Sequence, residues 1–312
     1  MKKTAFFFPG QGSQSVGMGQ EFYTGYDFVR EIFDMAEELT KINISRLCFK
    51  GPMADLTETV NLQPALTTVN LSCLAMINKE CVKPFVSAGH SLGEYSALCS
   101  AGVINGEETI KLVYKRGSLM HREALKHKGA MSAIIGLGID EVSEIVADVR
   151  NEGIIAVANH NTEKQIVITG SPEQVQKAGS IASAKGARAI PLKVSGAWHS
   201  ELIKGAENEF VEFLDTFSFT KPESAIILNV TGDFVTNSND ILFTMKKQLC
   251  SPVRWYDTVQ KLIEEEVEVF VEAGPGKVLA GLLKKILPKD YPRSIFNINN
   301  MKSLDNFFKE VL

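Results

Sequence analysis

Short apolar runs alternate along this chain with longer segments in which apolar residues recur every three or four positions. This pattern is typical of α/β proteins. Residues 4–8 are predicted to form a buried strand that ends at Pro9-Gly10. Similar runs predict further strands at residues 85–89, 226–230 and 267–271. Helical spacing predicts helices over residues 27–39, 65–77, 94–101, 107–125 and 277–286. We therefore expect a parallel sheet with helices packed on it.

The middle of the chain has a different pattern. Its predicted elements are strand 131–137, helix 140–150, strands 154–158 and 165–169, helix 172–185 and strand 188–194. This β-α-β-β-α-β order is that of the ferredoxin-like split unit. We therefore predict a ferredoxin-like subdomain at residues 127–195, inserted in a larger α/β domain made of residues 1–126 and 196–312.

Composition and charge narrow the class of protein. The chain has 312 residues, 45% of them hydrophobic, which is enough to bury a sizeable core. Its 33 Lys and Arg against 37 Asp and Glu give a net charge of −4, which argues against a nucleic-acid partner. No stretch of about 18 uncharged apolar residues occurs, so no membrane span is expected. The apolar run near the N-terminus is too short for a signal peptide, so we expect a cytoplasmic protein.

Cysteine usage agrees with that location. The five cysteines are odd in number and include no Cys-x-x-Cys pair. This argues against a disulfide framework and against a cysteine zinc site, and we expect reduced thiols.

The strongest chemical motif is Gly89-His90-Ser91-Leu92-Gly93, a G-x-S-x-G sequence between a predicted strand and a predicted helix. That context is the one in which a nucleophile elbow occurs. The flanking glycines permit the tight turn that exposes the serine hydroxyl. The helix that follows directs backbone N–H groups toward a developing oxyanion. The motif therefore predicts a nucleophilic serine at position 91.

A nucleophilic serine needs a base, and the chain offers five histidines. His90 adjoins the serine and should point elsewhere on a tight turn. His121 and His127 lie in a basic segment that we expect to be solvated, and His160 lies between two asparagines. His199 follows a predicted strand and comes late in the chain, in the Ser-before-His order of α/β hydrolases. Elimination favours His199, but the residues alone do not decide the base.

Two glycine-rich loops and one arginine complete the candidates. The loops at residues 8–14 and 274–277 fit neither G-x-G-x-x-G nor the P-loop, so no nucleotide-phosphate site is predicted. The first loop suits an oxyanion hole or a plain turn. Arg116 lies in a predicted helix, where an arginine is usually a surface charge. Gly117 directly after it is unusual in a helix and often marks the close approach of another group.

Eight short motifs occur in one order between about residue 4 and about residue 286. They are Phe8-Pro9-Gly10-Gln11-Gly12-Ser13-Gln14, Gln63-Pro64-Ala65, Gly89-His90-Ser91-Leu92-Gly93-Glu94-Tyr95, Arg116-Gly117, Asn159-His160-Asn161, Gly196-Ala197-Trp198-His199-Ser200, Ser251-Pro252-Val253-Arg254-Trp255 and Gly274-Pro275-Gly276-Lys277-Val278-Leu279. Together they resemble the malonyl-CoA:acyl-carrier-protein transacylase family. The resemblance implies a hydrolase-like α/β domain with an inserted ferredoxin-like subdomain, which agrees with the predicted strand order.

The resemblance also implies roles for matched positions. Ser91 would carry the malonyl ester, and His199 would act as general base and then as general acid. Arg116 would hold the malonyl carboxylate with both branches of its guanidinium. The backbone N–H groups of Gln11 and Leu92 would form the oxyanion hole.

Further matched positions surround these residues. Gln248 corresponds to the position that orients the histidine in place of a carboxylate. Asn159 and Asn161 match positions near the substrate. The residue before the histidine is often Phe in malonyl-selective relatives, whereas here it is Trp198. The larger indole should crowd the α-carbon of the substrate and disfavour a methyl branch.

The resemblance implies a ping-pong acyl transfer from malonyl-CoA to the phosphopantetheine thiol of holo acyl carrier protein, with no cofactor and no metal. We expect a monomer. Two alternatives stay open: a serine thioesterase or hydrolase, which would need an Asp or Glu in its triad and no Arg116, and a discrete acyltransferase that serves a polyketide synthase. A catalytically silent CoA-binding module is disfavoured because both Ser91 and His199 are present. Carrier proteins are acidic, so a local basic patch is expected among Lys115, Lys126, Lys128, Lys185, Arg188, Lys277, Lys284 and Lys285.

Overall fold

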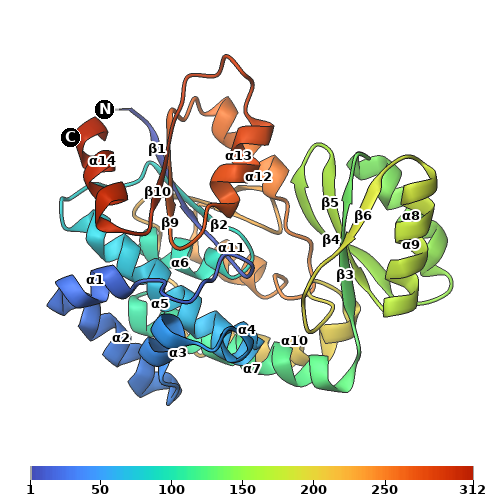
Figure 1. Cartoon of the computed structure of the whole chain (residues 1–312), viewed down its shortest axis with the longest axis horizontal. Coiled ribbons are helices and arrows are strands. Elements are labelled where there is room, and N and C mark those ends of the chain that lie inside the picture. Colours follow the sequence, from blue (N-terminus) through green and yellow to red (C-terminus); the bar gives the residue numbers. More distant parts are fainter. Residues whose placement is uncertain (1, 312) are drawn as a thin grey trace.

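The larger of two lobes is built on a six-stranded sheet with the order β10-β9-β1-β2-β7-β8 (Figure 1). A computed structural model describes residues 2–311. All neighbouring strands of this sheet are parallel except β8, which pairs antiparallel with β7. The strands are β1 (Thr4–Phe8), β2 (Val86–Gly89), β7 (Ala225–Leu228), β8 (Asp233–Phe234), β9 (Val269–Ala273) and β10 (Ser294–Ile298).

Helices cover both faces of the sheet, and β1 shows why its residues are apolar throughout. Phe6 and Phe8 pack into the core beneath α5, α6 and α7, whereas Ala5 and Phe7 pack against α12 and α13 on the opposite face. Successive side chains of a strand point to opposite faces, so a strand covered on both sides needs a continuous apolar run. Phe7 meets Trp255 edge-on, with ring centroids 5.0 Å apart.

The helices of this lobe fall into two groups. The first half of the chain contributes α1 (Gln20–Gly25), α2 (Asp27–Thr40), α3 (Ile44–Lys50), α4 (Met53–Thr57), α5 (Thr59–Asn78), α6 (Gly93–Ser100) and α7 (Gly106–Lys126). The second half contributes the 3-10 helix η1 (Glu201–Ala206), α10 (Glu207–Leu214), α11 (Ser238–Met245), α12 (Trp255–Glu264), α13 (Val278–Ile286) and α14 (Met301–Val311).

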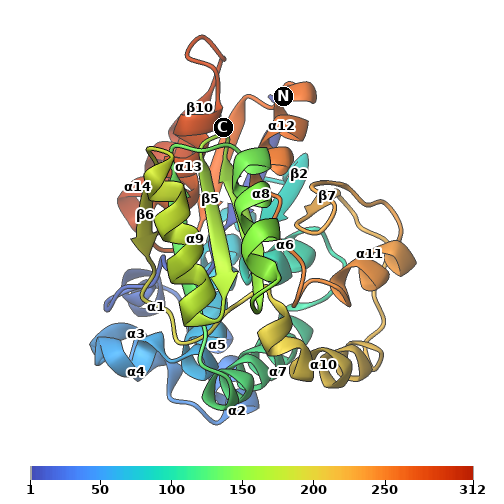
Figure 2. The same cartoon turned by 90° about the vertical axis from the view of Figure 1, so that its right-hand side faces the viewer.

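The smaller lobe is a four-stranded antiparallel sheet with the order β4-β5-β3-β6. Two helices, α8 and α9, lie on its outer face and enclose a separate apolar core (Figure 2). Its opposite face contributes Met131, Ala133, Ala158 and Val167 to the main core of the larger lobe. Its elements are β3 (Ala130–Ile135), α8 (Ile139–Arg150), β4 (Ile155–Thr162), β5 (Gln165–Gly170), α9 (Pro172–Ala184) and β6 (Arg188–Pro191).

The two crossings between the lobes touch each other. A Cβ added at Gly129 would lie 2.3 Å from the backbone nitrogen of Ala197, so the outgoing and returning chains meet at van der Waals contact. A second connection is the bridge between β4 and the segment before α12, where the Val253 N–H donates to the Ala158 carbonyl over 2.8 Å. The smaller lobe is therefore held beside the carboxyl ends of β1 and β2.

Helix α5 tests the expectation that no membrane span exists. By length and composition this 20-residue helix, which carries no charged residue, could cross a membrane. However, 83% of its most apolar 18-residue window is buried inside the protein. Its lack of charged residues agrees with its central place between α2, α6 and α7, and it is a core helix here.

Candidate active site

Ser91 lies on a sharp turn between β2 and α6. Its φ of +51° is in the left-handed region that residues with a side chain rarely adopt. The turn is tight enough to require both flanking glycines. A Cβ at Gly89 would lie 2.0 Å from the Gly93 carbonyl carbon, and a Cβ at Gly93 would lie 1.9 Å from the Phe8 carbonyl oxygen. The predicted strand–turn–helix context of this motif is confirmed.

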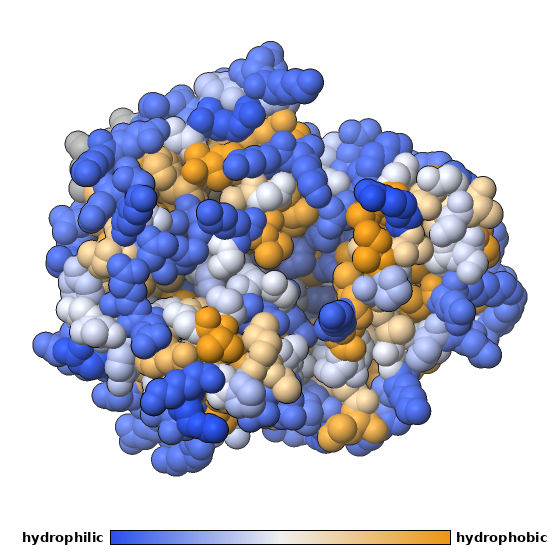
Figure 3. Space-filling model, viewed as in Figure 1, coloured by the Kyte–Doolittle hydropathy of each residue, from blue (hydrophilic) through white to orange (hydrophobic). Residues whose placement is uncertain are grey.

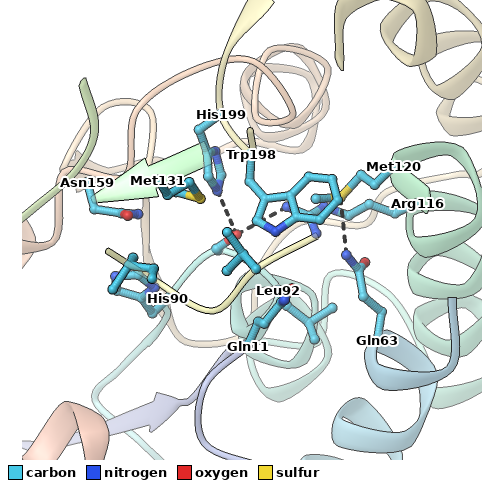
Figure 4. A pocket seen from close by; sticks show the side chains of 13 residues that line it. Gln11, Gln63, His90, Leu92, Arg116, Met120, Met131, Asn159, Trp198 and His199 are labelled. Carbon is cyan, nitrogen blue, oxygen red and sulfur yellow. Dashed lines mark hydrogen bonds between the residues drawn. The ribbon is translucent and has the colours of Figure 1, made fainter. Parts of the chain in front are cut away.

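The serine hydroxyl has two hydrogen-bond partners, marked by dashed lines in Figure 4. Its Oγ is 2.8 Å from Nε2 of His199 and accepts a hydrogen bond from Nη2 of Arg116 over 3.1 Å. These three residues come from the elbow, from the segment after the smaller lobe and from α7, which lie far apart in the sequence. The structure therefore places His199, the histidine that elimination favoured, beside the serine.

The second nitrogen of His199 fixes its orientation. Nδ1 is 2.8 Å from the carbonyl oxygen of Ser251, so Nδ1 carries the proton and Nε2 is free to accept one. Burial and the nearby Arg116 cation lower the pKa of His199 to about 3, opposed by hydrogen bonds to the backbone of Ser251 and Gln248. The imidazole is therefore neutral at pH 7. Its partner is a neutral carbonyl, whereas a hydrolase triad has a carboxylate at this position.

Gln248 contributes to the site through its backbone and through its side chain. Its backbone faces the His199 imidazole, whereas its side chain has other partners. Its Nε2 donates to the Ser91 carbonyl and to Oε2 of Glu94, each over 2.9 Å, and its Oε1 accepts from Nε of Arg116 over 3.2 Å. The family resemblance placed Gln248 in the site, but its position in the sequence gave no sign of these partners.

Arg116 is not the surface charge that an isolated helical arginine suggests. It is 1% exposed, and its guanidinium lies 5.7 Å from the centre of the Tyr95 ring. Close packing of α5 and α7 explains the glycine beside it, since a Cβ at Gly117 would lie 2.9 Å from the Thr59 carbonyl oxygen. Burial lowers the pKa of Arg116, but an arginine remains charged at neutral pH.

Two residues that the sequence did not single out support the elbow. Asn229, directly after β7, accepts from the Ser91 N–H over 2.7 Å and donates to the Gly89 carbonyl over 2.6 Å. Glu94, in the first turn of α6, is fully buried and accepts from the Asn229 N–H over 2.5 Å. Burial raises the pKa of Glu94 to about 7, opposed by its hydrogen bonds and by Arg116. Glu94 directly follows the G-x-S-x-G motif, within the matched segment Gly89–Tyr95, and this position was the one available sequence signal.

Ser91 opens into a small cavity of about 100 Å³. This is below the roughly 300–1,000 Å³ of pockets that enclose a whole drug-sized ligand, so it suits a short acyl group. Gln11 and Leu92 line it, and among residues 2–311 neither of their backbone N–H groups makes a hydrogen bond. A hollow between the two lobes, with hydrophobic side chains along the rim of the smaller lobe, is visible in Figure 3. The cavity is lined by residues of both lobes.

The two expected asparagines have different positions. Asn159 on β4 lines the cavity, whereas Asn161 on the same strand is hydrogen-bonded through Oδ1 to Nε2 of His90 over 2.8 Å. His90 lines the cavity too, and it packs on Trp255 with ring centroids 5.6 Å apart. The His90–Asn161 bond therefore connects the elbow to the smaller lobe.

Trp198 lines the same cavity and is 4% exposed. Its six-membered ring lies against Gly196, where a Cβ would come within 2.7 Å of two ring carbons. The indole therefore lies between the returning chain and the cavity, which Arg116 and Gln63 also line (Figure 4).

Over the described residues 2–311, no group of three or more His, Cys, Asp or Glu side chains could hold a metal ion. None of the five cysteines is paired in a disulfide.

The fold and these contacts define a class: α/β proteins that carry a serine on a strand–turn–helix elbow with a neutral histidine beside it. Comparisons with known proteins narrow the class. The family described as acyl transferase domain matches residues 5–303, and the chain belongs to this family. A malonyl CoA-acyl carrier protein transacylase of Bacillus subtilis is 42% identical over 288 residues, which cover 92% of this chain and 91% of the relative.

Solved structures agree with this assignment. FabD from Acinetobacter baumannii superposes with a TM-score of 0.94 at 35% identity, covering 99% of this chain and 98% of that one. The malonyl-transacylase PlMCAT, solved with the type II polyketide synthase acyl-carrier protein AntF, superposes with a TM-score of 0.93 at 35% identity and covers 99% of both chains. The likeness therefore extends over both lobes.

Proposed function

We propose that this protein transfers a malonyl group from malonyl-CoA to the phosphopantetheine thiol of acyl carrier protein. The observation that carries the proposal is the pair of contacts on Ser91 Oγ, which has His199 at 2.8 Å and the buried guanidinium of Arg116 at 3.1 Å. The first contact supplies a nucleophile and its base. The second places a cation where the free carboxylate of a malonyl group can reach it.

The reaction takes place in two half-reactions. Nε2 of His199 removes the proton from Ser91 Oγ as the oxygen attacks the thioester carbonyl of malonyl-CoA. The N–H groups of Gln11 and Leu92 stabilise the oxyanion of the tetrahedral intermediate. The C–S bond then breaks, CoA takes the proton from His199 and leaves as a thiol, and the malonyl ester remains on Ser91. In the second half-reaction His199 deprotonates the carrier thiol, whose sulfur attacks the ester carbonyl. The bond between the acyl carbon and Ser91 Oγ then breaks, and His199 returns the proton to Oγ.

Arg116 selects the acyl group in this proposal. A bidentate pair with the malonyl carboxylate fixes the thioester carbonyl over Ser91, which lowers the entropic part of the barrier. Trp198 limits room at the α-carbon, and Asn159 faces the same cavity. Gln248 acts on Arg116 and on the Ser91 carbonyl.

The main competing function is hydrolysis of a thioester or ester. A hydrolase triad would place a carboxylate on Nδ1 of His199, where the Ser251 carbonyl lies, and would have no use for a buried arginine beside the nucleophile. These two observations favour transfer. The polyketide or fatty-acid origin of the carrier protein is the remaining alternative, and both carriers would use the same site.

We extend the proposal to the domain organisation, cofactor use, location and oligomeric state that the family resemblance implies. The parallel-sheet lobe is hydrolase-like and comprises residues 1–126 and 196–312, and the inserted ferredoxin-like subdomain comprises residues 127–195. Every step above is an acyl or proton transfer among groups already named, so we propose that no cofactor takes part. We further propose a cytoplasmic monomer.

Incubation of the enzyme with radiolabelled malonyl-CoA, with and without holo acyl carrier protein, separates the functions. We expect a stable acyl-enzyme without the carrier and labelled carrier protein with it. Rapid release of free malonate would indicate a hydrolase, and no labelling at all would indicate a binding module.

A further inference from the structure

A buried arginine that must stay free for its substrate presents a physical conflict. A cation removed from water needs a nearby anion, since an uncompensated buried charge is costly. A carboxylate paired directly with the guanidinium would, however, occupy the groups that the substrate carboxylate has to use. The structure resolves this conflict through Glu94 and Gln248.

Glu94 and Arg116 are connected through one neutral amide. Oε2 of Glu94 accepts from Nε2 of Gln248 over 2.9 Å, and Oε1 of Gln248 accepts from Nε of Arg116 over 3.2 Å. All three side chains are at most 1% exposed. The negative charge of Glu94 is therefore close enough to compensate the Arg116 cation, but the Gln248 side chain lies between the two groups.

The ionised carboxylate also decides which way the amide faces. A carboxylate can only accept hydrogen bonds, so the NH2 group of Gln248 must point at Glu94 and its oxygen must point at Arg116. Gln248 then engages Nε and leaves the Nη1–Nη2 edge of the guanidinium, whose Nη2 already reaches Ser91 Oγ over 3.1 Å. This is the edge that a bidentate carboxylate would occupy.

Resting on the proposed malonyl transfer, we propose that Glu94 is a positioning residue for acyl selectivity. Its carboxylate sets the orientation of the Gln248 amide, and that amide holds Arg116 with its outer edge open to the carboxylate of the substrate. Glu94 touches neither substrate nor reacting atoms. Loss of its charge should therefore weaken recognition of malonyl more than it weakens acylation itself.

Glu94→Gln keeps the shape of the side chain and removes its charge. The new amide can still accept from the Asn229 N–H through its oxygen, so support of the elbow is retained. Its NH2 group then faces Gln248, whose amide turns to present its oxygen. The NH2 group of Gln248 is thereby directed at Nε of Arg116, where two donors repel each other, and the guanidinium loses its fixed position.

The chain offers a matched control in Glu272 at the end of β9. It is 1% exposed and accepts from the backbone N–H groups of Leu279 and Ala280 over 3.0 and 2.9 Å. Glu272→Gln makes the same chemical change in an equally buried side chain, but one that contacts the first turn of α13 and lies outside the Ser91 site. It should leave acyl selectivity unchanged, whatever it does to stability.

The experiment measures single-turnover acylation by malonyl-CoA and by acetyl-CoA, with the wild type assayed first. Failure of the wild type to accept malonyl would overturn the proposed function, not this inference alone. In Glu94→Gln we expect the malonyl-to-acetyl ratio to fall about tenfold, as for loss of one hydrogen bond to a charged group. In a Gln248→Leu background, Glu94→Gln should leave the malonyl-to-acetyl ratio unchanged, because the amide that connects Glu94 to Arg116 is already absent. An unchanged ratio, or an equal fall for both acyl groups, would overturn the inference.

A pH series on the wild type tests the same idea without a variant, should Glu94→Gln fail to fold. Protonation of Glu94, with its pKa raised to about 7, has the same effect as the substitution. The titratable groups around it are Arg116 on α7, Tyr95 on α6, and His90 and His199 beside Ser91. The first two hold their protons, and burial lowers the pKa of both imidazoles, which disfavours their protonation. The malonyl-to-acetyl ratio should fall between pH 8 and pH 6, and a flat ratio would contradict the proposal.

Discussion

Arg116 is the residue whose environment says most about the substrate. It is buried, it contacts Ser91, and its nearest compensating carboxylate acts through an intervening amide. The sequence placed this residue in a helix and the family resemblance gave it a role. Only the packing of α7 against α5 and α6 shows that it is removed from water and available to an anion.

Arg116→Ala should reduce acylation by malonyl-CoA by about 30-fold or more. Leaving a bound carboxylate unpaired costs about 2–5 kcal/mol, and each 1.4 kcal/mol is a factor of ten. Acylation by acetyl-CoA should change much less. Arg116→Lys should restore only part of the malonyl rate, since an ammonium cannot form the two-pronged pair. An unchanged malonyl-to-acetyl preference in Arg116→Ala would mean that another residue recognises the carboxylate.

The pH dependence of acylation follows from His199. Its pKa of about 3 leaves Nε2 unprotonated throughout the neutral and mildly acidic range. Because a base is lost only as pH falls through its own pKa, the rate of acylation by acetyl-CoA should be flat between pH 5 and pH 8. Acetyl-CoA is the suitable substrate because its acyl group has no carboxylate. A descending limb centred near 6.5, the ordinary pKa of histidine, would contradict this environment.

At the scale of elements, all four strands of the smaller sheet and four of the six strands of the larger one (β1, β2, β7 and β9) were predicted close to their observed positions. Residues 4–8 match β1, and the β-α-β-β-α-β order of the smaller lobe is confirmed. Each of these segments has a clear period of two or 3.6, or is uniformly apolar. Short helices such as α3 and α4, and the pair β10 and α14 beyond the recognised motifs, were not predicted.

The elements do not reveal the contacts that join distant segments. Asn229 and Gln248 lie in turns after β7 and α11, and their partners are backbone groups more than a hundred residues away. Hydrogen bonds of this kind depend on tertiary placement and leave no local pattern. The Ser251 carbonyl beside His199 is the clearest case, because a backbone acceptor has no sequence signature at all.

Two helical glycines should respond in opposite ways to substitution by alanine, because one is at a close helix contact and the other faces open space. Gly117→Ala should destabilise the protein by about 1–3 kcal/mol, because the added Cβ would meet the Thr59 carbonyl oxygen at 2.9 Å and the Gln63 Cβ at 3.2 Å. It should also displace Arg116 and weaken malonyl preference. Gly281→Ala in α13 has no atom within 4 Å and should stabilise by about 1 kcal/mol. Urea unfolding of both variants checks this, and a stabilised Gly117→Ala would refute the packing argument.

The whole molecule has a net charge of −4, so an acidic carrier protein needs a local positive surface. Two of the eight candidate residues are already engaged, since Lys115 pairs with Glu209 and Lys126 with Glu123. Lys277, Lys284 and Lys285 are exposed around α13, and Lys185 and Arg188 are exposed on the smaller lobe. Nζ of Lys285 donates to Oε1 of Gln165 on β5 over 3.4 Å. The basic residues around α13 therefore lie beside the smaller lobe, which carries the other exposed pair.

The salt dependence of the two half-reactions tests this surface. Transfer of malonyl to holo acyl carrier protein should slow with added salt more than acylation by malonyl-CoA does, because the protein partner is steered by charge. Transfer to free pantetheine, which is an uncharged thiol, is the control and should be nearly insensitive to salt. Equal salt dependence of all three reactions would argue against electrostatic docking.

The central claim is that Ser91 carries the malonyl group between its two thiol partners. Intact-mass spectrometry after incubation with malonyl-CoA tests it most directly, with far-UV circular dichroism to confirm folding. The wild type should gain the mass of one malonyl group, and Ser91→Ala should gain none while keeping its fold, because Oγ is the atom that forms the ester. A malonyl adduct that persists in folded Ser91→Ala would contradict the account.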